Sequence, residues 1–182
     1  MLEIRWHGRG GQGAVTSVEL FALSAIGEGK FAQGFPSFGT ERRGAPVTGF
    51  NRVDDKQIKI RSGIYHPDVV VVLDPSLVSL VDVAEGLKPD GVLLVNSTKS
   101  LEELKKDIRF EGKIATVDAT GIAWKELGVP ITNTTMLGAV VKVTGAVKIE
   151  SIEGPVQGRF GRIAAKNLAA AKRAYDEVKF IN

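Results

Sequence analysis

A glycine-rich segment near the N-terminus carries the residues best suited to binding a charged ligand. It reads His7-Gly8-Arg9-Gly10-Gly11-Gln12-Gly13 and follows residues 2–6, in which apolar and polar side chains alternate. Apolar residues then recur at helical spacing from Val15 to Ile26. Glycine tolerates positive φ and close approach of another group, and a helix start exposes unpaired N–H groups at the positive end of its dipole. The segment is predicted to join a first strand to a first helix and to offer an anion site.

The same glycines raise the question of dinucleotide binding. Gly8, Gly10 and Gly13 match G-x-G-x-x-G, but that fingerprint also needs an acidic residue at the end of the second strand to hold a ribose hydroxyl. The second strand is expected at residues 30–35, which end without a carboxylate, and Glu41 lies well beyond them. We therefore favour a different phosphate-bearing ligand or a partner subunit over NAD. A purely structural role, in which the glycines only permit a tight turn, stays open.

A second candidate segment spans residues 36–46 and contains two prolines, two glycines and an aromatic residue beside three consecutive charges. This composition predicts a surface loop, and loops of this length are often functional. Its Glu41-Arg42-Arg43 run suits a phosphate clamp or an ion-pair cluster with another chain. A solvated connection without a binding role is the alternative.

Other chemistry is excluded by what the sequence lacks. The chain has no cysteine and two histidines, His7 and His66. A disulfide, a thiolate metal site, a cysteine-held iron–sulfur cluster, a cysteine nucleophile and a multi-histidine metal site are therefore excluded. No serine occurs in G-x-S-x-G. We expect no catalytic residue and no metal site in this chain, and for His7 we favour a structural role over donation to a ligand.

The elements that must position these segments predict one α/β domain over residues 1–182. Its sheet is expected to be single, doubly wound and mostly parallel but mixed, with flanking helices and a β-hairpin insertion. Asp74 follows a β-branched run typical of a buried strand. It is expected to cap the helix that Pro75 begins, with a role at the ligand-binding edge as the alternative. The predicted strands after residue 46 are 47–53 and 57–61, which form the hairpin, then 69–73, 92–95 and 114–117.

The predicted helices differ in how apolar they are. Two carry a single charge each, Glu19 in the first and Lys142 in the helix at 136–143 that Asn133 or Thr134 is expected to cap. Helices this apolar are buried on more than one side, so at least one is expected to pack against another chain; enclosure within this domain is the alternative. The remaining predicted helices are 76–85, 101–106, a short one ending at 127, and an amphipathic one at 160–178.

Composition indicates a globular protein without a membrane or nucleic-acid role. Hydrophobic residues make up 43% of the 182 residues and charged residues 25%, both ordinary for such proteins. No apolar run reaches the length of a membrane span, and the N-terminus does not resemble a signal peptide, so a cytoplasmic location is expected. The net charge is +3, but basic residues are not interleaved with aromatics as nucleic-acid binding would require.

Five stretches of the chain resemble the gamma subunits of the 2-oxoacid:ferredoxin oxidoreductases, in particular those of the pyruvate enzymes (pyruvate synthases). They are residues 7–13, 35–47, 68–74, 95–97 and 133–139. The resemblance covers essentially the whole chain and implies a subunit that works with alpha, beta and delta partners. A stand-alone nucleotide-binding or adaptor module of the same fold is the alternative.

The resemblance also implies where the cofactors lie. Thiamine diphosphate with Mg is expected between the alpha and beta chains, and the 4Fe-4S clusters on the beta and delta chains, with none on this chain. The implied reaction converts pyruvate, coenzyme A and oxidised ferredoxin to acetyl-CoA, CO2 and reduced ferredoxin. The residues expected to meet coenzyme A or a partner subunit are Gly8, Arg9, Gly10, Gly11, Gln12, Gly13, Phe38, Gly39, Thr40, Glu41, Arg42 and Arg43.

Overall fold

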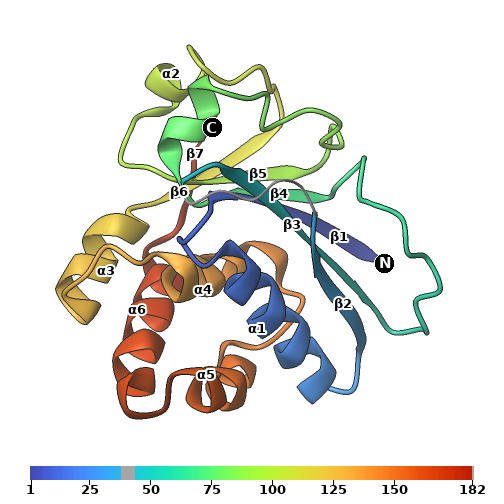
Figure 1. Cartoon of the computed structure of the whole chain (residues 1–182). Helices are drawn as coiled ribbons and strands as arrows, with labels where there is room; N and C mark the ends of the chain where they lie inside the picture. The colour runs from blue at the N-terminus through green and yellow to red at the C-terminus, as the bar shows by residue number, and fades with distance from the viewer. Residues whose placement is uncertain (38–43, 182) are drawn as a thin grey trace.

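The chain is built on a seven-stranded sheet, as the computed structural model shows for residues 1–37 and 44–181. The strand order is β2-β3-β1-β4-β5-β6-β7 (Figure 1). The strands are β1 (Leu2–Arg9), β2 (Phe31–Pro36), β3 (Pro46–Asp54), β4 (Val69–Val72), β5 (Val92–Asn96), β6 (Lys113–Val117) and β7 (Lys179–Ile181). β1, β4, β5 and β6 are parallel, whereas every pairing of β3 or β7 is antiparallel. The predicted mixed, mostly parallel sheet is confirmed.

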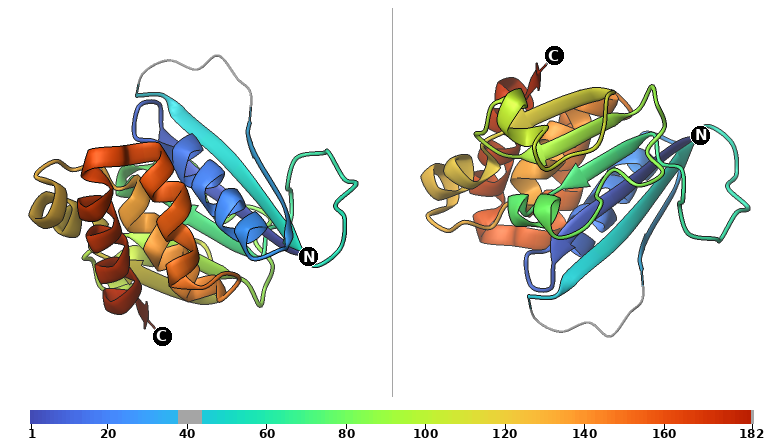
Figure 2. Two further views of the ribbon diagram at one scale, coloured as in Figure 1. Left: turned by 90° about the horizontal axis from the view of Figure 1, so that it is seen from below. Right: turned by 90° about the horizontal axis from the view of Figure 1, so that it is seen from above.

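Helices lie on both faces of the sheet, which confirms the doubly wound arrangement (Figures 1 and 2). One face carries α1 (Ala14–Gly27), α3 (Ala119–Leu127), α4 (Asn133–Thr144), α5 (Glu153–Phe160) and α6 (Ala164–Glu177). The other face carries the 3-10 helix η1 (Pro75–Ser79) and α2 (Leu101–Leu104). Within the described part of the chain, no helix has the length and apolar character to span a membrane.

Helix α1 is locked against β1, β2 and β3. Gly34 and Gly49 let it approach, because a Cβ on either would lie 3.0 Å or 2.7 Å from the Val18 side chain. The Asn51 amide donates to the Val18 carbonyl (2.9 Å) and its oxygen accepts from the Trp6 indole N–H (2.8 Å). Such fully satisfied buried polar groups fix one geometry. The start of α1 is thereby held at the end of β1.

Helix α4 is enclosed by its own chain. Every residue from Asn133 to Val141 is buried, and the helix packs between the sheet and α6. The expectation of a second chain is therefore wrong for α4. For α1 it stays a prediction, because Val15, Leu23 and Ile26 are 43%, 44% and 51% exposed.

The predicted hairpin has the wrong second strand. Residues 57–61 form no strand, and β3 instead pairs with β1 along one edge and with β2 along the other. With both edges of β3 hydrogen-bonded, no edge is left for residues 57–61 to pair with. The hairpin of the fold is β2–β3.

Three helix predictions also need correction. Residues 76–85 give only η1. The Asp82 side chain accepts from the Ala84 N–H (3.2 Å), a local turn that competes with helical hydrogen bonding. The helix predicted at 160–178 is broken at Gly161, whose φ is 50°, so α6 begins only at Ala164. Two short elements, α5 and β7, were not predicted from the sequence. Neither predicted cap of α4 is right: Thr132 is its N-cap residue, without a side-chain cap.

Candidate functional site

The candidate site lies where the direction of winding reverses. After β1 the chain turns through α1 toward β2 at one edge of the sheet, and after β4 it turns through η1 toward β5 and the other edge. Ligands of open α/β sheets bind at such switch points, outside the carboxyl ends of the strands. The glycine segment follows β1 and Asp74 follows β4, so the topology brings the two together.

The glycine segment makes a tight entry into α1. Gly8 and Arg9 are the last residues of β1, and Gly11 and Gly13 take positive φ angles of 91° and 81°. Gly13 is the N-cap residue of α1, without a side-chain cap. Among the described residues, the main-chain N–H groups of Gly11 and Gly13 have no acceptor. We call residues 8–13 the glycine turn; it presents free donors at the positive end of a helix.

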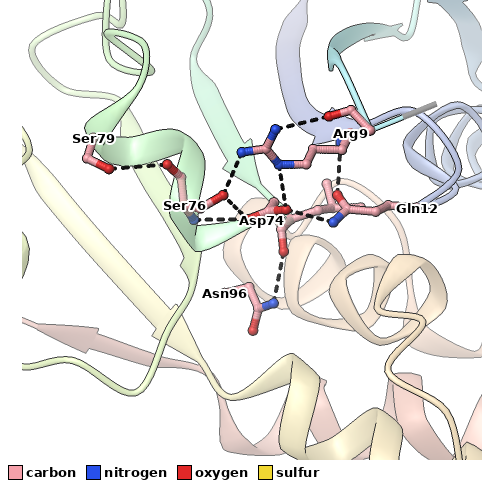
Figure 3. A network of polar contacts seen from close by, with 8 residues as sticks. Arg9, Gln12, Asp74, Ser76, Ser79 and Asn96 are labelled. Atoms are coloured by element: carbon pink, nitrogen blue, oxygen red, sulfur yellow. Dashed lines mark hydrogen bonds and ion pairs between the residues drawn. The ribbon is translucent and has the colours of Figure 1, made fainter. Parts of the chain in front are cut away.

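A polar network fixes this turn to the end of β4 (Figure 3). Asp74 Oδ2 accepts from Arg9 Nε (3.0 Å) and Gln12 Nε2 (2.7 Å). Its Oδ1 accepts from the main-chain N–H (2.9 Å) and the hydroxyl (2.6 Å) of Ser76. We call Arg9, Gln12, Asp74 and Ser76 the Asp74 network. The predicted capping role of Asp74 is confirmed, and the carboxylate also joins η1 to the glycine turn.

Arg9 is occupied within the chain. Besides Asp74, its guanidinium donates to the Gly44 carbonyl (3.0 Å) and to the Ser76 hydroxyl (2.8 Å). Its main-chain N–H donates to Gln12 Oε1 (2.8 Å). Arg9 thus positions the turn, and the donors left for a ligand are mainly main-chain N–H groups.

The Asp74 carboxylate is held in its ionised form. Its burial opposes ionisation, but hydrogen bonds from Ser76 and Gln12 and the charge of Arg9 outweigh that penalty, so the pKa of Asp74 lies below its ordinary value. The carboxylate therefore keeps its four hydrogen bonds and its ion pair across the neutral pH range.

The two segments predicted to bind meet at their bases. In the β1–β3 ladder Gly8 lies opposite Val47 and Arg9 opposite Pro46. The Gly10 N–H donates to the Ala45 carbonyl (2.9 Å), and the Gly44 N–H to the Gly10 carbonyl (3.1 Å). The glycine turn therefore contacts the end of the second predicted segment. The predicted residues Phe38, Gly39, Thr40, Glu41, Arg42 and Arg43 lie outside the described residues.

Two supports of the site were not predicted from the sequence. Asn133, at the start of α4, lies against Gly13 so closely that a Cβ there would be 2.5 Å from its amide nitrogen. Asn96, at the end of β5, donates to the Leu73 carbonyl (2.8 Å) and to Thr120 Oγ1 (2.9 Å). Asn96 is a polar residue at the end of an apolar strand, and Asn133 is a polar residue just before an apolar helix; these positions are the signals that mark them.

The geometry also disfavours an ordinary dinucleotide site. In the dinucleotide fold the second strand lies beside the first and supplies the ribose-binding carboxylate. Here β3 separates β2 from β1, and β2 ends at Pro36.

His7 is held by a hydrogen bond within its own strand, and the structural role that we favoured for it stays a prediction. Its Nε2 accepts from Arg5 Nε (3.1 Å), and burial together with the Arg5 charge lowers the pKa of His7 from 6.5 to about 4. The ring is therefore neutral at pH 7.

The lowered pKa of His7 predicts that acid destabilises the folded chain. Below about pH 6.5 the unfolded chain protonates His7 while the folded chain does not, so stability falls as pH falls toward 4. Between pH 7 and pH 5 we expect a loss of about 2 kcal/mol in the free energy of unfolding from this group. Urea unfolding across this range measures it. His7→Gln should remove the loss and His66→Gln should keep it; equal pH dependence in His7→Gln and the unmodified chain would contradict the assignment.

Comparisons with known proteins agree on one family. The family model described as pyruvate ferredoxin/flavodoxin oxidoreductase matches residues 3–177. The "pyruvate/ketoisovalerate oxidoreductases common subunit gamma" of Thermococcus kodakarensis is 56% identical over 179 residues, which cover 97% of each chain. The "pyruvate synthase subunit PorC" of Methanocaldococcus jannaschii is 51% identical over 179 residues, covering 98% of this chain and 97% of that one. The crystal structure of pyruvate oxidoreductase subunit PORC from Thermotoga maritima superposes with a TM-score of 0.91 at 45% identity, covering 100% of this chain and 98% of that one.

Proposed function

The chain belongs to the pyruvate ferredoxin/flavodoxin oxidoreductase family as the gamma subunit of a pyruvate:ferredoxin oxidoreductase, and from this premise we propose that its glycine turn binds coenzyme A. The assembled enzyme, pyruvate synthase, converts pyruvate, coenzyme A and oxidised ferredoxin to acetyl-CoA, CO2 and reduced ferredoxin. In this proposal the gamma chain holds a co-substrate, and partner subunits carry out the electron transfer.

The residues of this chain do not fit the redox cofactors of such an enzyme. The sequence has no cysteine to hold an iron–sulfur cluster. Within residues 1–37 and 44–181, no three His, Asp or Glu side chains gather closely enough to hold a metal ion. We therefore assign thiamine diphosphate with its Mg, and the 4Fe-4S clusters, to alpha, beta and delta partners, and we keep ferredoxin as the electron acceptor. The cytoplasmic location expected from the sequence stays a prediction.

The glycine turn fits the phosphates of coenzyme A. The free N–H groups of Gly11 and Gly13 adjoin an α1 N-terminus without a side-chain cap, and such donors favour anions. The Asp74 network fixes the turn before a ligand arrives, which reduces the entropy lost on binding. This preorganised turn is the observation that carries the proposal. The stand-alone module has no comparable support, because the relatives of equal length are named as subunits.

The proposal predicts that Gly11→Ala weakens coenzyme A saturation of the assembled enzyme. Gly11 has φ 91°, and alanine resists that angle at a cost of about 1–2 kcal/mol, so the N–H groups shift and the KM for coenzyme A rises about tenfold. Steady-state assays against coenzyme A measure the change, with size-exclusion chromatography to verify assembly. Arg42→Ala tests whether the second segment contributes to the same KM.

Gly29→Ala is the matched control. Gly29 also has positive φ, 81°, and a Cβ there meets nothing within 4 Å, but it follows α1 and so lies away from the turn. The control should leave the KM for coenzyme A unchanged. If Gly11→Ala abolishes assembly, the turn is a subunit interface; if it assembles and binds coenzyme A normally, the proposed site is wrong.

A further inference from the structure

The face of the sheet that points away from α1 carries a cavity that the proposed function does not use. It measures about 320 Å³ and lies over β1 and β3, at the lower end of the range for small-molecule sites. Successive side chains of a strand alternate between faces. Trp6 packs on Phe21 under α1, so Arg5 and His7 face the other way, into the lining of this cavity. We call it the Arg5 cavity.

Arg5 places a buried positive charge in the lining. The residue is 9% exposed. Its Nη2 donates to the carbonyls of Val83 (3.1 Å) and Glu85 (2.5 Å), and its Nε to His7. Among the described residues, Nη1 has no hydrogen-bond acceptor. The negative charges of Glu85 and Asp82 already act on this guanidinium, and an anionic oxygen that enters the cavity can accept from the remaining N–H groups of Nη1.

His7 adds a second spare donor beside it. Because an arginine nitrogen can only donate, His7 Nε2 must be the acceptor of that bond, and the neutral ring carries its proton on Nδ1. Within the described part of the chain, His7 Nδ1 makes no hydrogen bond. Arg5 and His7, which lie on one face of β1, thus both line the cavity, and each has an N–H group without an acceptor among the described residues, as a carboxylate ligand requires.

The rest of the lining differs in character. Asp82 and Glu85 are exposed acidic residues whose charge acts on Arg5, and a positive group nearer solvent would share that negative charge with the guanidinium. Phe50 and Ile64 are buried and line the same cavity, which suits an apolar side chain.

We propose that the Arg5 cavity binds a small α-amino acid with an apolar side chain. Its carboxylate accepts from Arg5 Nη1 and His7 Nδ1, its ammonium group faces Asp82 and Glu85, and its side chain packs on Phe50 and Ile64. This site goes beyond the proposed coenzyme A site and does not rest on it, because it lies on the other face of the sheet and shares no residue with the glycine turn.

Calorimetric titration of the full chain tests whether the cavity recognises the carboxylate, the ammonium group and the apolar side chain of such a ligand. The probes are L-phenylalanine, phenylpyruvate, which lacks the ammonium group, and phenethylamine, which lacks the carboxylate. We expect L-phenylalanine to bind saturably, phenylpyruvate about tenfold more weakly, and phenethylamine not at all. No saturable binding of L-phenylalanine, or equal binding of all three probes, would overturn the proposal.

Substitution of the two exposed acidic residues of the cavity tests the proposal without disturbing the buried core. Asp82→Asn with Glu85→Gln should weaken L-phenylalanine binding about tenfold and leave phenylpyruvate unchanged. The matched control, Asp55→Asn with Asp90→Asn, removes two exposed acids outside the cavity and should change neither. If the first pair binds L-phenylalanine as the unmodified chain does, the cavity is not an amino-acid site. The Gly11→Ala chain should bind L-phenylalanine as the unmodified chain does, so the test of the Arg5 cavity is independent of whether the coenzyme A proposal is right.

Discussion

Replacing Asp74 with alanine is expected to lower the free energy of unfolding by about 3 kcal/mol and to raise the KM for coenzyme A about thirtyfold. The substitution removes the cap of η1 and all four hydrogen bonds that the carboxylate accepts. It also leaves the Arg9 guanidinium, only 25% exposed, without its counter-ion. The glycine turn then loses its attachment to β4, so its N–H groups are no longer preorganised.

Asp68→Ala separates these two effects. Asp68 also accepts a hydrogen bond from a main-chain N–H, that of Glu3 (2.8 Å), and pairs with Lys88 (2.6 Å). It precedes β4 and therefore lies at the amino end of that strand, away from the glycine turn at the carboxyl ends. It should destabilise the chain and leave the KM for coenzyme A unchanged. Chemical unfolding of the isolated chain and saturation assays of the assembled enzyme measure the two quantities. If Asp74→Ala and Asp68→Ala raise this KM equally, the network has no specific role at the ligand site.

Local signals in the sequence were sufficient for the main elements of the site. The change from alternating to helical spacing around the glycines predicted β1, the turn and α1, and the run before Asp74 predicted β4. These features depend on residues close together in the chain, where side-chain period and turn chemistry act directly. The rule for ligand sites in open sheets placed Asp74 at the carboxyl end of its strand, but only the strand order shows that the glycine turn lies beside it.

Contacts between distant segments were not predictable in the same way. The alternation at residues 57–61 favours a strand wherever an edge is free, and only the complete sheet shows that β1 and β2 occupy both edges of β3. The pairing of Arg9 with Asp74 joins residues 65 positions apart. Likewise the apolar character of α4 indicated burial, but not that α6 of the same chain provides it.

The contact between α4 and α6 gives the second large effect. Gly138→Ala is expected to lower the free energy of unfolding by about 4 kcal/mol. Helix propensity alone predicts the opposite sign, because alanine is favoured over glycine by about 1 kcal/mol in a helix. Contact decides the outcome: a Cβ on Gly138 would lie 1.9 Å from the carbonyl oxygen of Ala171 and 2.8 Å from its Cα. These are backbone atoms, so the two helices must separate within a close-packed core.

Two further variants distinguish this explanation from a general intolerance of substitution. Gly158→Ala lies in α5, where a new Cβ meets nothing within 4 Å, so propensity should act alone and raise stability by up to about 1 kcal/mol. Ala171→Gly should not rescue Gly138→Ala, because the clash is with main-chain atoms that glycine retains. Urea unfolding of the three chains measures these changes. Asn133 at the start of α4 lies against Gly13, so a shift of α4 should also displace the glycine turn and raise the KM for coenzyme A. If Gly138→Ala destabilises the chain but leaves this KM unaltered in the assembled enzyme, α4 does not position the site.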